Sequence, residues 1–311
     1  MSIEVLKPGM LTTIQDRGRL GCAMLGVGRA GPMDDIAMRL ANALVGNAID
    51  AAVLEITLAG PRLRFDAPTT IALTGAEFRN VASWRPLGVD AGDVLDIGTA
   101  RHGARAYLAI AGGLAVDPTL GSVSTDVNAG IGGSPLREGD RIAMRASERA
   151  TVRDMRWSLD PRPWFDADAT HAIRLVRGTH FELLDAASRD ALFTQPFRVG
   201  KDSNRVGFRL DGPMLALSAP LELVSEPLAI GTLQLPPGGA PIALMTEHPT
   251  VGGYPRIGQI AAVDVPRLAQ RRPGDVVRFA EIDLDGAQTR YLARERELAK
   301  LVEAIGERLQ R

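Results

Sequence analysis

Short apolar runs, each bounded by Gly, Pro or Asp, recur along the whole 311-residue chain. Each run has the length of a β-strand and is too short for a typical helix. The chain also contains 33 glycines and 20 prolines, spread throughout, as many tight turns between short strands require. The pattern therefore predicts a mainly β protein with a few helices. Strands are expected at Val53–Leu58, Thr70–Leu73, Val94–Ile97, Ala106–Ile110, Ala172–Val176, Leu228–Leu235, Pro241–Met245 and Val276–Phe279.

A Gly-Asp pair precedes a predicted strand three times, at residues 92–93, 139–140 and 274–275. Glycine accepts a positive φ and aspartate can bond to nearby backbone, so the pair suits a turn that leads into a strand. Two of these turns lie in the first half of the chain and one in the second. This repetition favours two related β-domains.

The stretch 146–168 mixes charged residues with Pro161 and Pro163 and has no clear period, as is typical of a linker. We therefore expect a first β-domain at 1–150, a linker at 151–170 and a second β-domain with a C-terminal helix at 171–311.

Two segments have helical periodicity. Asp34–Val45 gathers its apolar residues on one face, begins with acidic residues and is followed by Gly46, a suitable helix stop. Residues 287–309 also alternate apolar and charged faces at helical spacing. This second segment is expected to be a surface helix packed on its own domain, and a partner-binding helix is the alternative.

Charge and cysteine content exclude several classes of protein. Lys and Arg number 36 and Asp and Glu 37, so no basic excess favours nucleic acid or anionic membrane. The single cysteine, Cys22, cannot form an intramolecular disulfide or a Cys-rich zinc site. The four histidines lack metal-ligand spacing, so no metal is expected. The N-terminus does not resemble a signal peptide and no apolar stretch approaches membrane-spanning length, so a cytoplasmic protein is expected.

Residues 26–31 match the Gly-x-Gly-x-x-Gly pattern of dinucleotide-binding folds and precede the first predicted helix. The pattern is informative only after a buried strand. Here a polar, glycine-broken loop precedes it, and only Cys22–Leu25 could form a strand. A glycine-rich loop leading into a helix is therefore the better interpretation. The chain also lacks a P-loop and a nucleophile elbow, so any ATP is expected to be bound by another chain.

Five polar clusters flanked by glycine or proline have no evident packing role. They combine rigid turns with hydroxyls, guanidinium groups and carboxylates. Arginine can grip a carboxylate or carbonyl, and glycine lets backbone N–H groups approach a ligand. Loops of this kind display binding sites on β scaffolds. The clusters are Thr13–Arg19, Gly121–Asp126, Ser203–Leu210, Pro236–Pro241 and Thr250–Pro255.

In this order the clusters resemble those of the biotin-dependent carboxyltransferase-like family. This family includes the C-type chain of 5-oxoprolinase, Kip-antagonist proteins, allophanate hydrolase subunit 2 and the carboxyltransferase region of urea carboxylase. The resemblance implies two cyclophilin-like β-barrel domains with a cleft between them. It also extends over residues 8–19, 30–34, 41–47, 54–55, 73–76, 106–113, 124–126, 203–210, 231–237 and 252–255.

The activity that the resemblance implies is that of the C-type subunit of an ATP-dependent 5-oxoprolinase complex, which cleaves 5-oxoproline to glutamate. The expected partners are a B-type (Kip-inhibitor-like) subunit and an A-type subunit. This chain is expected to bind no cofactor itself, and ATP is used by the complex. The chemistry of the side chains at the matching motif positions suggests roles for individual residues. Catalytic roles are expected for Asp126, Arg205 and Arg209. Substrate-binding roles are expected for Gln15, Asp16, Arg19, Ser124, Thr125, Asn204, Gly252, Gly253 and Tyr254.

Two alternatives remain within the family. One is transfer of a carboxyl group from carboxybiotin to urea or a related amide; the chain has no Met-Lys-Met attachment sequence, so biotin would arrive on a partner. The other is a non-catalytic regulatory module that binds a Kip-type kinase inhibitor.

The chain departs from the family pattern at two places. Val123 stands where the family usually has Arg, and Glu247-His248-Pro249 replaces a stretch that usually begins with Asp and Gln. Valine cannot supply the charge or donors of a guanidinium group. If the family Arg grips a substrate carboxylate, this chain is expected to show altered substrate choice or reduced activity.

Overall fold

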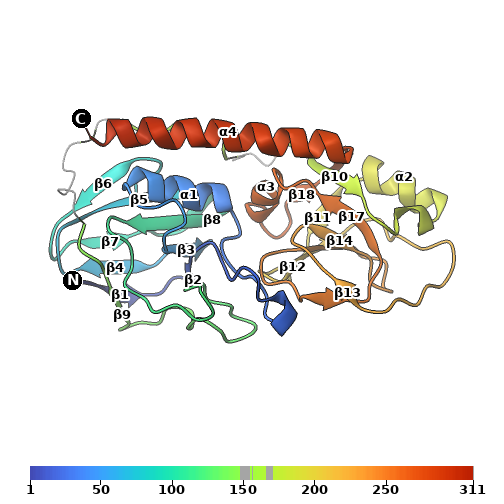
Figure 1. The fold of residues 1–311 in the computed structure, drawn as a ribbon, viewed down its shortest axis with the longest axis horizontal. Coiled ribbons are helices and arrows are strands. Elements are labelled where there is room, and N and C mark those ends of the chain that lie inside the picture. Colours follow the sequence, from blue (N-terminus) through green and yellow to red (C-terminus); the bar gives the residue numbers. More distant parts are fainter. Residues whose placement is uncertain (148–154, 156, 166–170, 311) are drawn as a thin grey trace. The chain divides into compact units, whose positions relative to one another are not determined.

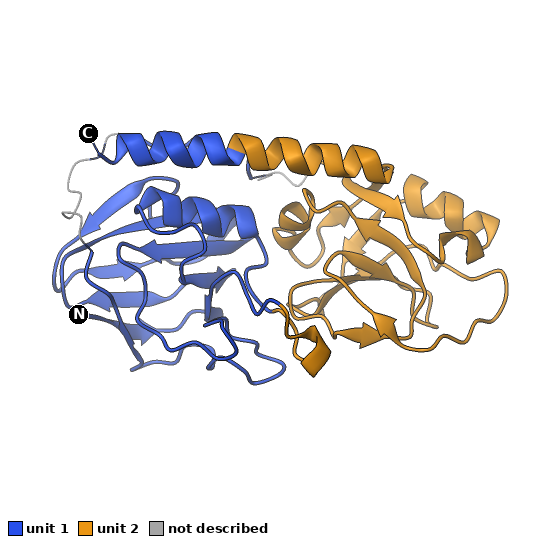
Figure 2. Ribbon diagram, viewed as in Figure 1, with its two compact units in different colours: residues 1–20, 30–168, 298–311 blue, residues 21–29, 169–297 orange. Residues whose placement is uncertain are grey.

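The computed structural model describes residues 1–147, 155, 157–165 and 171–310 and divides the chain into two compact units (Figure 2). The predicted domains follow chain order, whereas each unit also takes a segment from the other half of the chain. Much of the predicted linker 151–170 lies outside the described residues. Unit 1 comprises Met1–Leu20, Ala30–Asp168 and Leu298–Arg311, and unit 2 comprises Gly21–Arg29 and Ala169–Glu297.

Unit 1 is built on two antiparallel sheets (Figure 1). The five-stranded sheet has the order β2 (Leu11–Gln15), β3 (Val53–Thr57), β8 (Ala100–Ile110), β5 (Thr69–Phe78) and β6 (Pro86–Val89). The four-stranded sheet has the order β7 (Val94–Asp96), β4 (Arg62–Phe65), β1 (Ser2–Lys7) and β9 (Arg141–Ala143).

The five-stranded sheet is buried on both faces, because strand residues alternate between two core clusters. Leu54 and Ile56 of β3 belong to the cluster shared with the four-stranded sheet. Val53 belongs to the cluster shared with helix α1 (Asp35–Leu44). Since every residue of β3 is buried, a polar side chain in this strand needs a hydrogen-bond partner.

The predicted first helix is confirmed as α1. The Asp34 carboxylate accepts a hydrogen bond from the Ala37 N–H (3.0 Å) and caps the helix. The helix ends before Gly46, whose φ is +73°. Next to it, the Asn47 side chain bonds to the main chain of Ile110 (2.8 Å) and Gly112 (2.9 Å) and so ties the helix end to β8.

Unit 2 contains an eight-stranded sheet, antiparallel except for the β10–β19 pair. Its edge strands β18 and β19 are separated in the chain by one residue, Arg278, so the two edges of the sheet meet and the sheet is nearly closed. The order is β18 (Val276–Val277), β11 (Phe197–Val199), β12 (Gly207–Asp211), β15 (Ile242–Leu244), β14 (Thr232–Gln234), β17 (Arg256–Ile260), β10 (Ile173–Arg177) and β19 (Phe279–Glu281).

Smaller elements complete the chain. The 3-10 helix η1 is counted with unit 2, although it follows the first strands in sequence. Helix α4 contributes its first part to unit 2 and its last part to unit 1. These elements are η1 (Ala23–Leu25), η2 (Phe181–Leu183), α2 (Ala186–Thr194), α3 (Val265–Ala269), α4 (Leu284–Arg308) and the two-stranded sheet of β13 (Glu226–Pro227) and β16 (Val251–Gly252).

The C-terminal helix is longer than predicted, and its two parts have different environments. Leu298 and Ile305 are buried in the core cluster that contains α1. Tyr291 and Leu292, nearer its start, are exposed. The last part therefore packs on unit 1 rather than on the strands that precede it in sequence.

The prediction of a mainly β protein with few helices is confirmed. Each of the eight predicted runs overlaps a strand, but in two of them a residue inside the run interrupts the strand. Residues 228–235 supply only β14, because Gly231 makes a turn with a φ of +82°. Residues 276–279 are divided between β18 and β19.

The three Gly-Asp turns share one geometry. Gly92, Gly139 and Gly274 have φ values of +91°, +87° and +91°. In each turn the Asp carboxylate accepts a hydrogen bond from the backbone N–H of the residue three positions earlier, with N···O distances of 2.7–2.8 Å. The strands β7, β9 and β18 follow directly, so the predicted turns are confirmed.

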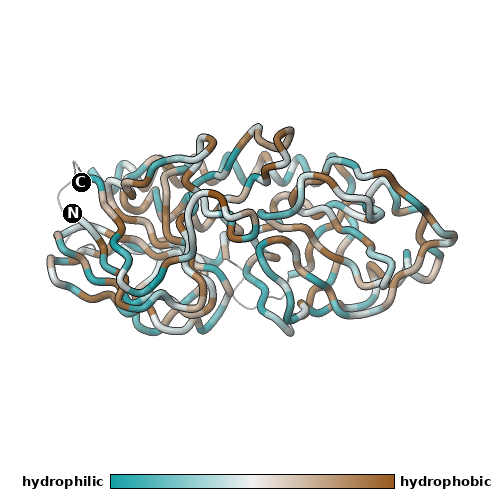
Figure 3. The backbone as a smooth tube through the Cα atoms, turned by 90° about the horizontal axis from the view of Figure 1, so that it is seen from below, coloured by the Kyte–Doolittle hydropathy of each residue, from teal (hydrophilic) through white to brown (hydrophobic). Residues whose placement is uncertain are grey.

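The segment before the glycine-rich pattern is not a strand. Residues 23–25 form η1, which has no buried residue, so Cys22–Leu25 does not form the short strand that the sequence left possible. The buried strand that a dinucleotide site requires is therefore missing at this place. Figure 3 shows hydrophobic and hydrophilic residues interleaved along the chain, and no described helix is long and apolar enough to cross a membrane.

Candidate functional site

Asp16, which directly follows β2, organises the first polar cluster of unit 1. One of its carboxylate oxygens accepts hydrogen bonds from the hydroxyls of Ser122 (2.5 Å) and Ser124 (2.6 Å) and from the Gly18 N–H (2.9 Å). The other accepts the Val123 N–H (2.9 Å). We call Asp16, Gly18 and Ser122–Ser124 the Asp16 cluster. It joins two loops that are more than one hundred residues apart in the chain.

The pKa of Asp16 is below its ordinary value of 3.8. Burial alone would raise it, but the hydroxyls of Ser122 and Ser124 and the N–H groups of Val123 and Gly18 stabilise the charged form and outweigh burial. Asp16 is therefore ionised at neutral pH. Because neutral donors surround it, it serves as an anchor for two loops rather than as a base.

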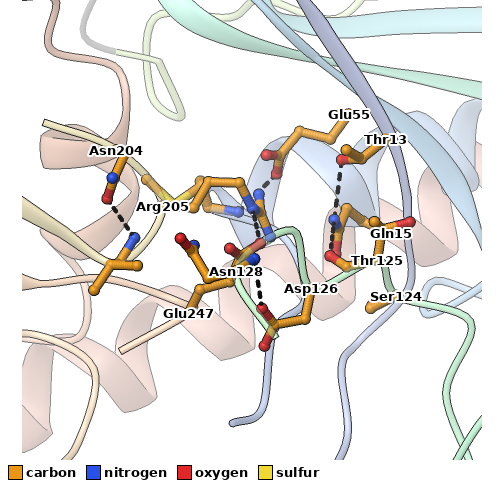
Figure 4. Close-up of polar contacts among 12 residues, drawn as sticks. Thr13, Gln15, Glu55, Ser124, Thr125, Asp126, Asn128, Asn204, Arg205 and Glu247 are labelled. Carbon is orange, nitrogen blue, oxygen red and sulfur yellow. Dashed lines mark hydrogen bonds and ion pairs between the residues drawn. The ribbon is translucent and has the colours of Figure 1, made fainter. Parts of the chain in front are cut away.

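Two further predicted residues bind the same loop through its carbonyl groups. The Gln15 amide donates to the Thr125 carbonyl (2.8 Å) and to the Thr13 hydroxyl (3.0 Å), as Figure 4 shows. The Arg19 guanidinium donates to the carbonyls of Ser124 (2.5 Å) and Thr119 (3.2 Å). Both side chains are almost fully buried. The six predicted site residues of unit 1 therefore lie together, because each either belongs to the segment 122–126 or is hydrogen-bonded to it. They are Gln15, Asp16, Arg19, Ser124, Thr125 and Asp126.

Asp126 closes the next turn of this loop. Its carboxylate accepts hydrogen bonds from the N–H groups of Asn128 (3.1 Å) and Ala129 (2.9 Å), and Figure 4 shows Asn128 beside it. Its main chain pairs with Ile131. The residues at the tip, Val127–Gly130, are exposed. Asp126 therefore shapes an exposed loop, and its predicted catalytic role remains a prediction.

Val123 occupies the centre of the Asp16 cluster through its backbone. Its N–H group binds the Asp16 carboxylate, a contact that any residue except proline could make. Its side chain is half-buried. Valine in place of the family Arg therefore leaves the hydrogen bonds of this cluster intact. The difference is that the side chain at this position has no charge and no hydrogen-bond donors.

In unit 2, Arg205 precedes β12 and forms a buried ion pair with Glu247, which follows β15. The two side chains are 3% and 0% exposed, so the charges are almost fully removed from water. The Glu247 N–H also donates to the Arg205 carbonyl (2.9 Å), which extends the β12–β15 pairing. Glu247 replaces an Asp of the family pattern with the same charge. The carboxylate thus orients the guanidinium that sequence reasoning assigned to catalysis.

The neighbouring predicted residues have different environments. The Asn204 side chain accepts the N–H groups of Val206 (2.9 Å) and Gly207 (3.4 Å) and forms the turn that leads into β12. Arg209 lies on the exposed face of β12, whereas Phe208 and Leu210 are buried. Arg209 therefore presents its guanidinium to solvent, where it could meet an anionic group.

Gly252 and Gly253 lie where β16 ends, and Tyr254 follows them, 47% exposed. A Cβ atom at Gly252 would lie 2.8 Å from Leu228 and 3.1 Å from the amide nitrogen of Gln234. Glycine is therefore required for close packing at this position. The Gln234 amide nitrogen is buried and has no hydrogen-bond partner among the described residues.

His248 stands next to the buried ion pair. Burial lowers the pKa of His248 below its ordinary 6.5, and a contact between Nδ1 and the Pro249 carbonyl (2.8 Å) opposes this only partly. The imidazole is therefore neutral at pH 7, with the proton on Nδ1. Among the described residues, no group of His, Cys, Asp and Glu side chains is arranged to hold a metal ion.

Sequence reasoning missed a buried polar pair in unit 1. Glu55 of β3 and Tyr107 of β8 are opposite each other in the sheet, and both are at most 1% exposed. The Tyr107 hydroxyl donates to the Glu55 carboxylate (2.8 Å). One signal was present: Glu55 is a charge within the otherwise uncharged run 53–58, which is otherwise a typical buried strand.

The comparisons with known proteins agree on one family. Residues 25–281 match the carboxyltransferase domain, subdomains A and B. The chain is 38% identical to the C-type 5-oxoprolinase subunit of Escherichia coli (strain K12), over 92% of this chain and 93% of that protein. It is 32% identical to the C-type 5-oxoprolinase subunit of Haemophilus influenzae, with the same two coverages. The crystal structure of the Kluyveromyces lactis urea carboxylase is 28% identical with a TM-score of 0.86, and the match covers 98% of this chain and 29% of that chain.

Proposed function

Because the chain belongs to the carboxyltransferase-domain family, we propose that it is the C-type subunit of a 5-oxoprolinase, which opens the lactam ring of 5-oxoproline to give glutamate. The observation that carries this proposal is the 38% identity to the Escherichia coli C-type 5-oxoprolinase subunit, which extends over nearly the full length of both chains. The urea carboxylase match covers only 29% of that longer chain, so it supports the domain type more than the activity.

The chemistry requires activation of the lactam, because amide resonance makes its carbonyl carbon a poor electrophile. In the proposed reaction, ATP phosphorylates the lactam oxygen and releases ADP. One water then adds to the carbon and the ring C–N bond breaks, and a second water releases phosphate from the acyl phosphate. We expect ATP to be bound by another chain of the complex, with B-type and A-type subunits as partners.

The described residues suggest different roles for the two arginines. Arg209 is exposed, so its guanidinium can orient toward the substrate carboxylate or a phosphate oxygen. Arg205 is oriented by Glu247, so its charge is fixed in place before substrate binds. Gln15, Ser124 and Thr125 would support the loop that faces the substrate, since their polar groups bind the loop itself.

The test is 5-oxoproline-dependent ADP release by this chain reconstituted with A-type and B-type partners, compared with each omission. Activity that needs all three chains supports the proposal. Arg209→Met is expected to raise the KM for 5-oxoproline at least about tenfold through loss of a charged contact. Arg198→Met is the matched control, because Arg198 is exposed on the adjacent strand β11. Equal KM values for the two variants would contradict the role of Arg209.

Carboxyl transfer from carboxybiotin to urea or a related amide is the second candidate, favoured by the TM-score of 0.86 to urea carboxylase. It requires a biotinylated partner. A streptavidin blot of the native complex without a biotinylated chain would contradict it. A complex that binds the B-type partner tightly but turns over neither substrate would favour the regulatory module instead.

A further inference from the structure

Glu55 and Tyr107 form a buried polar pair, in which the Tyr107 hydroxyl is bonded to the Glu55 carboxylate. The carboxylate lies on the sheet face that carries α1, where an isolated charge would be costly. Burial, together with the negative charges of Glu55 and Asp34, raises the pKa of Tyr107 well above 10.0. The hydroxyl therefore stays protonated at any ordinary pH and remains a donor to Glu55.

The pair holds the loop that leads into α1, residues 30–34, which we call the leading loop. The Met33 N–H donates to the Glu55 carboxylate (2.8 Å), and the Asp34 N–H donates to the Tyr107 oxygen (2.7 Å). Two consecutive N–H groups of the leading loop are thus bound to the sheet. Asp34 also caps α1, so the end of this loop is fixed to both the sheet and the helix.

At its other end the leading loop rests on the backbone of Arg17 and Gly18. Ala30 and Gly31 have positive φ values of +52° and +87°. A Cβ atom at Gly31 would lie 3.2 Å from the Arg17 carbonyl and from the Gly18 nitrogen. The Gly18 N–H in turn donates to the Asp16 carboxylate. A continuous path of contacts therefore runs from β3 and β8 to the Asp16 cluster.

We propose that Glu55 and Tyr107 are positioning residues, which fix the leading loop and through it the Asp16 cluster. This inference rests on the proposed function: the pair would support substrate binding indirectly, because the Asp16 cluster carries predicted substrate-binding residues. The pair need not touch the substrate. It acts through two backbone N–H groups and one close approach of two loops.

The first test is Tyr107→Phe, which removes only the hydroxyl. Amide hydrogen exchange at Met33, Asp34 and Gly18 is expected to accelerate at least about tenfold, because the variant loses both hydrogen bonds of the hydroxyl, the one to Glu55 and the one from the Asp34 N–H. Thr74→Val is the matched control: Thr74 is opposite Tyr107 in the same sheet, is 0% exposed, and its hydroxyl bonds to the Ala37 carbonyl of α1 (2.6 Å). It removes a buried hydroxyl that is not bonded to the leading loop. Equal exchange at Gly18 in the two variants would overturn the inference.

A second variant approaches the path from the other side. Gly31→Ala is expected to accelerate exchange at Gly18 while Met33 and Asp34 stay protected, because their bonds to the pair remain.

In the reconstituted complex, Tyr107→Phe is expected to raise the KM for 5-oxoproline about tenfold and to change kcat less than about twofold. An unchanged KM with accelerated exchange would overturn the link to substrate binding. If the complex has no 5-oxoprolinase activity, the proposed function fails, but the exchange results still decide the positioning role.

Discussion

Each unit holds a carboxylate beside predicted site residues, and the two are stabilised in different ways. Asp16 in unit 1 is met by neutral donors, two serine hydroxyls and two backbone N–H groups. Glu247 in unit 2 is met by the guanidinium of Arg205, and both of these side chains are buried. A carboxylate held by neutral donors leaves no buried charge behind when it is removed, whereas half of a buried ion pair does. Unit 1 therefore depends on loop geometry and unit 2 on charge balance.

The largest expected effect comes from breaking the buried ion pair. Glu247→Gln removes the negative charge that faces the buried Arg205 guanidinium and is expected to lower the free energy of unfolding by about 3–5 kcal/mol. Denaturant unfolding measures it. Glu226→Gln is the control, because Glu226 pairs with Arg256 but is 46% exposed, and its loss should be less than about 1 kcal/mol. Similar losses in both variants would refute the contrast between buried and exposed charge.

A double variant sharpens this comparison. Arg205→Met combined with Glu247→Leu removes both charges, so it is expected to be more stable than Glu247→Gln alone. If the double variant is the less stable one, the packing of these side chains matters more than their charge.

The next effect tests the dependence of unit 1 on loop geometry. Gly132 has a φ of +77°, and a Cβ there would overlap both the Arg19 guanidinium and the Ser124 carbonyl. Gly132→Ala is therefore expected to lower the free energy of unfolding by about 2–4 kcal/mol, from backbone strain and overpacking. Gly130→Ala shares the positive φ (+67°) but meets nothing within 4 Å, so about 1 kcal/mol is expected. Thermal unfolding compares the two variants. Equal decreases in their Tm values would mean that backbone strain alone, and not overlap with Arg19 and Ser124, causes the loss of stability.

Features decided by local chemistry could be predicted from the sequence. The turns at Gly92, Gly139 and Gly274 need only a positive φ and a neighbouring Asp, and α1 needs only its cap and apolar stripe. The break of the predicted strand before β14 was missed, because an apolar run does not show that Gly231 turns. The packing of Leu298 and Ile305 beside α1 was missed for another reason: it depends on tertiary contacts over more than two hundred residues.

The same distinction applies to the candidate site. The polar clusters were found because glycine and polar residues are visible in the sequence, and six of the predicted residues do meet in unit 1. What each residue binds could not be predicted. Arg205 meets Glu247 only because β12 pairs with β15, and the Glu55–Tyr107 contact depends on the register of β3 and β8. Strand register is set by the whole fold rather than by local sequence.

The smallest effect concerns Asp16 and carries a pH signature. Its folded pKa is lowered, so the ionised form stabilises the fold; this contribution is fully present above the ordinary value of 3.8 and is lost as the pH falls through the folded pKa. Asp16→Asn is expected to lower the free energy of unfolding by about 2 kcal/mol at pH 7, because hydrogen bonds to a charged acceptor are weakened. Urea unfolding at pH 7, 5, 4 and 3 should show that the difference in free energy of unfolding between Asp16→Asn and the unsubstituted protein shrinks only below about pH 4.

Asp66→Asn is the control: the pKa of Asp66 is also lowered, by hydrogen bonds from Ser2, but the group is fully exposed, so its replacement should change stability less at every pH. A difference for Asp16→Asn that stays constant from pH 7 to 3 would mean that the shape of the side chain, and not its charge, holds the two loops together.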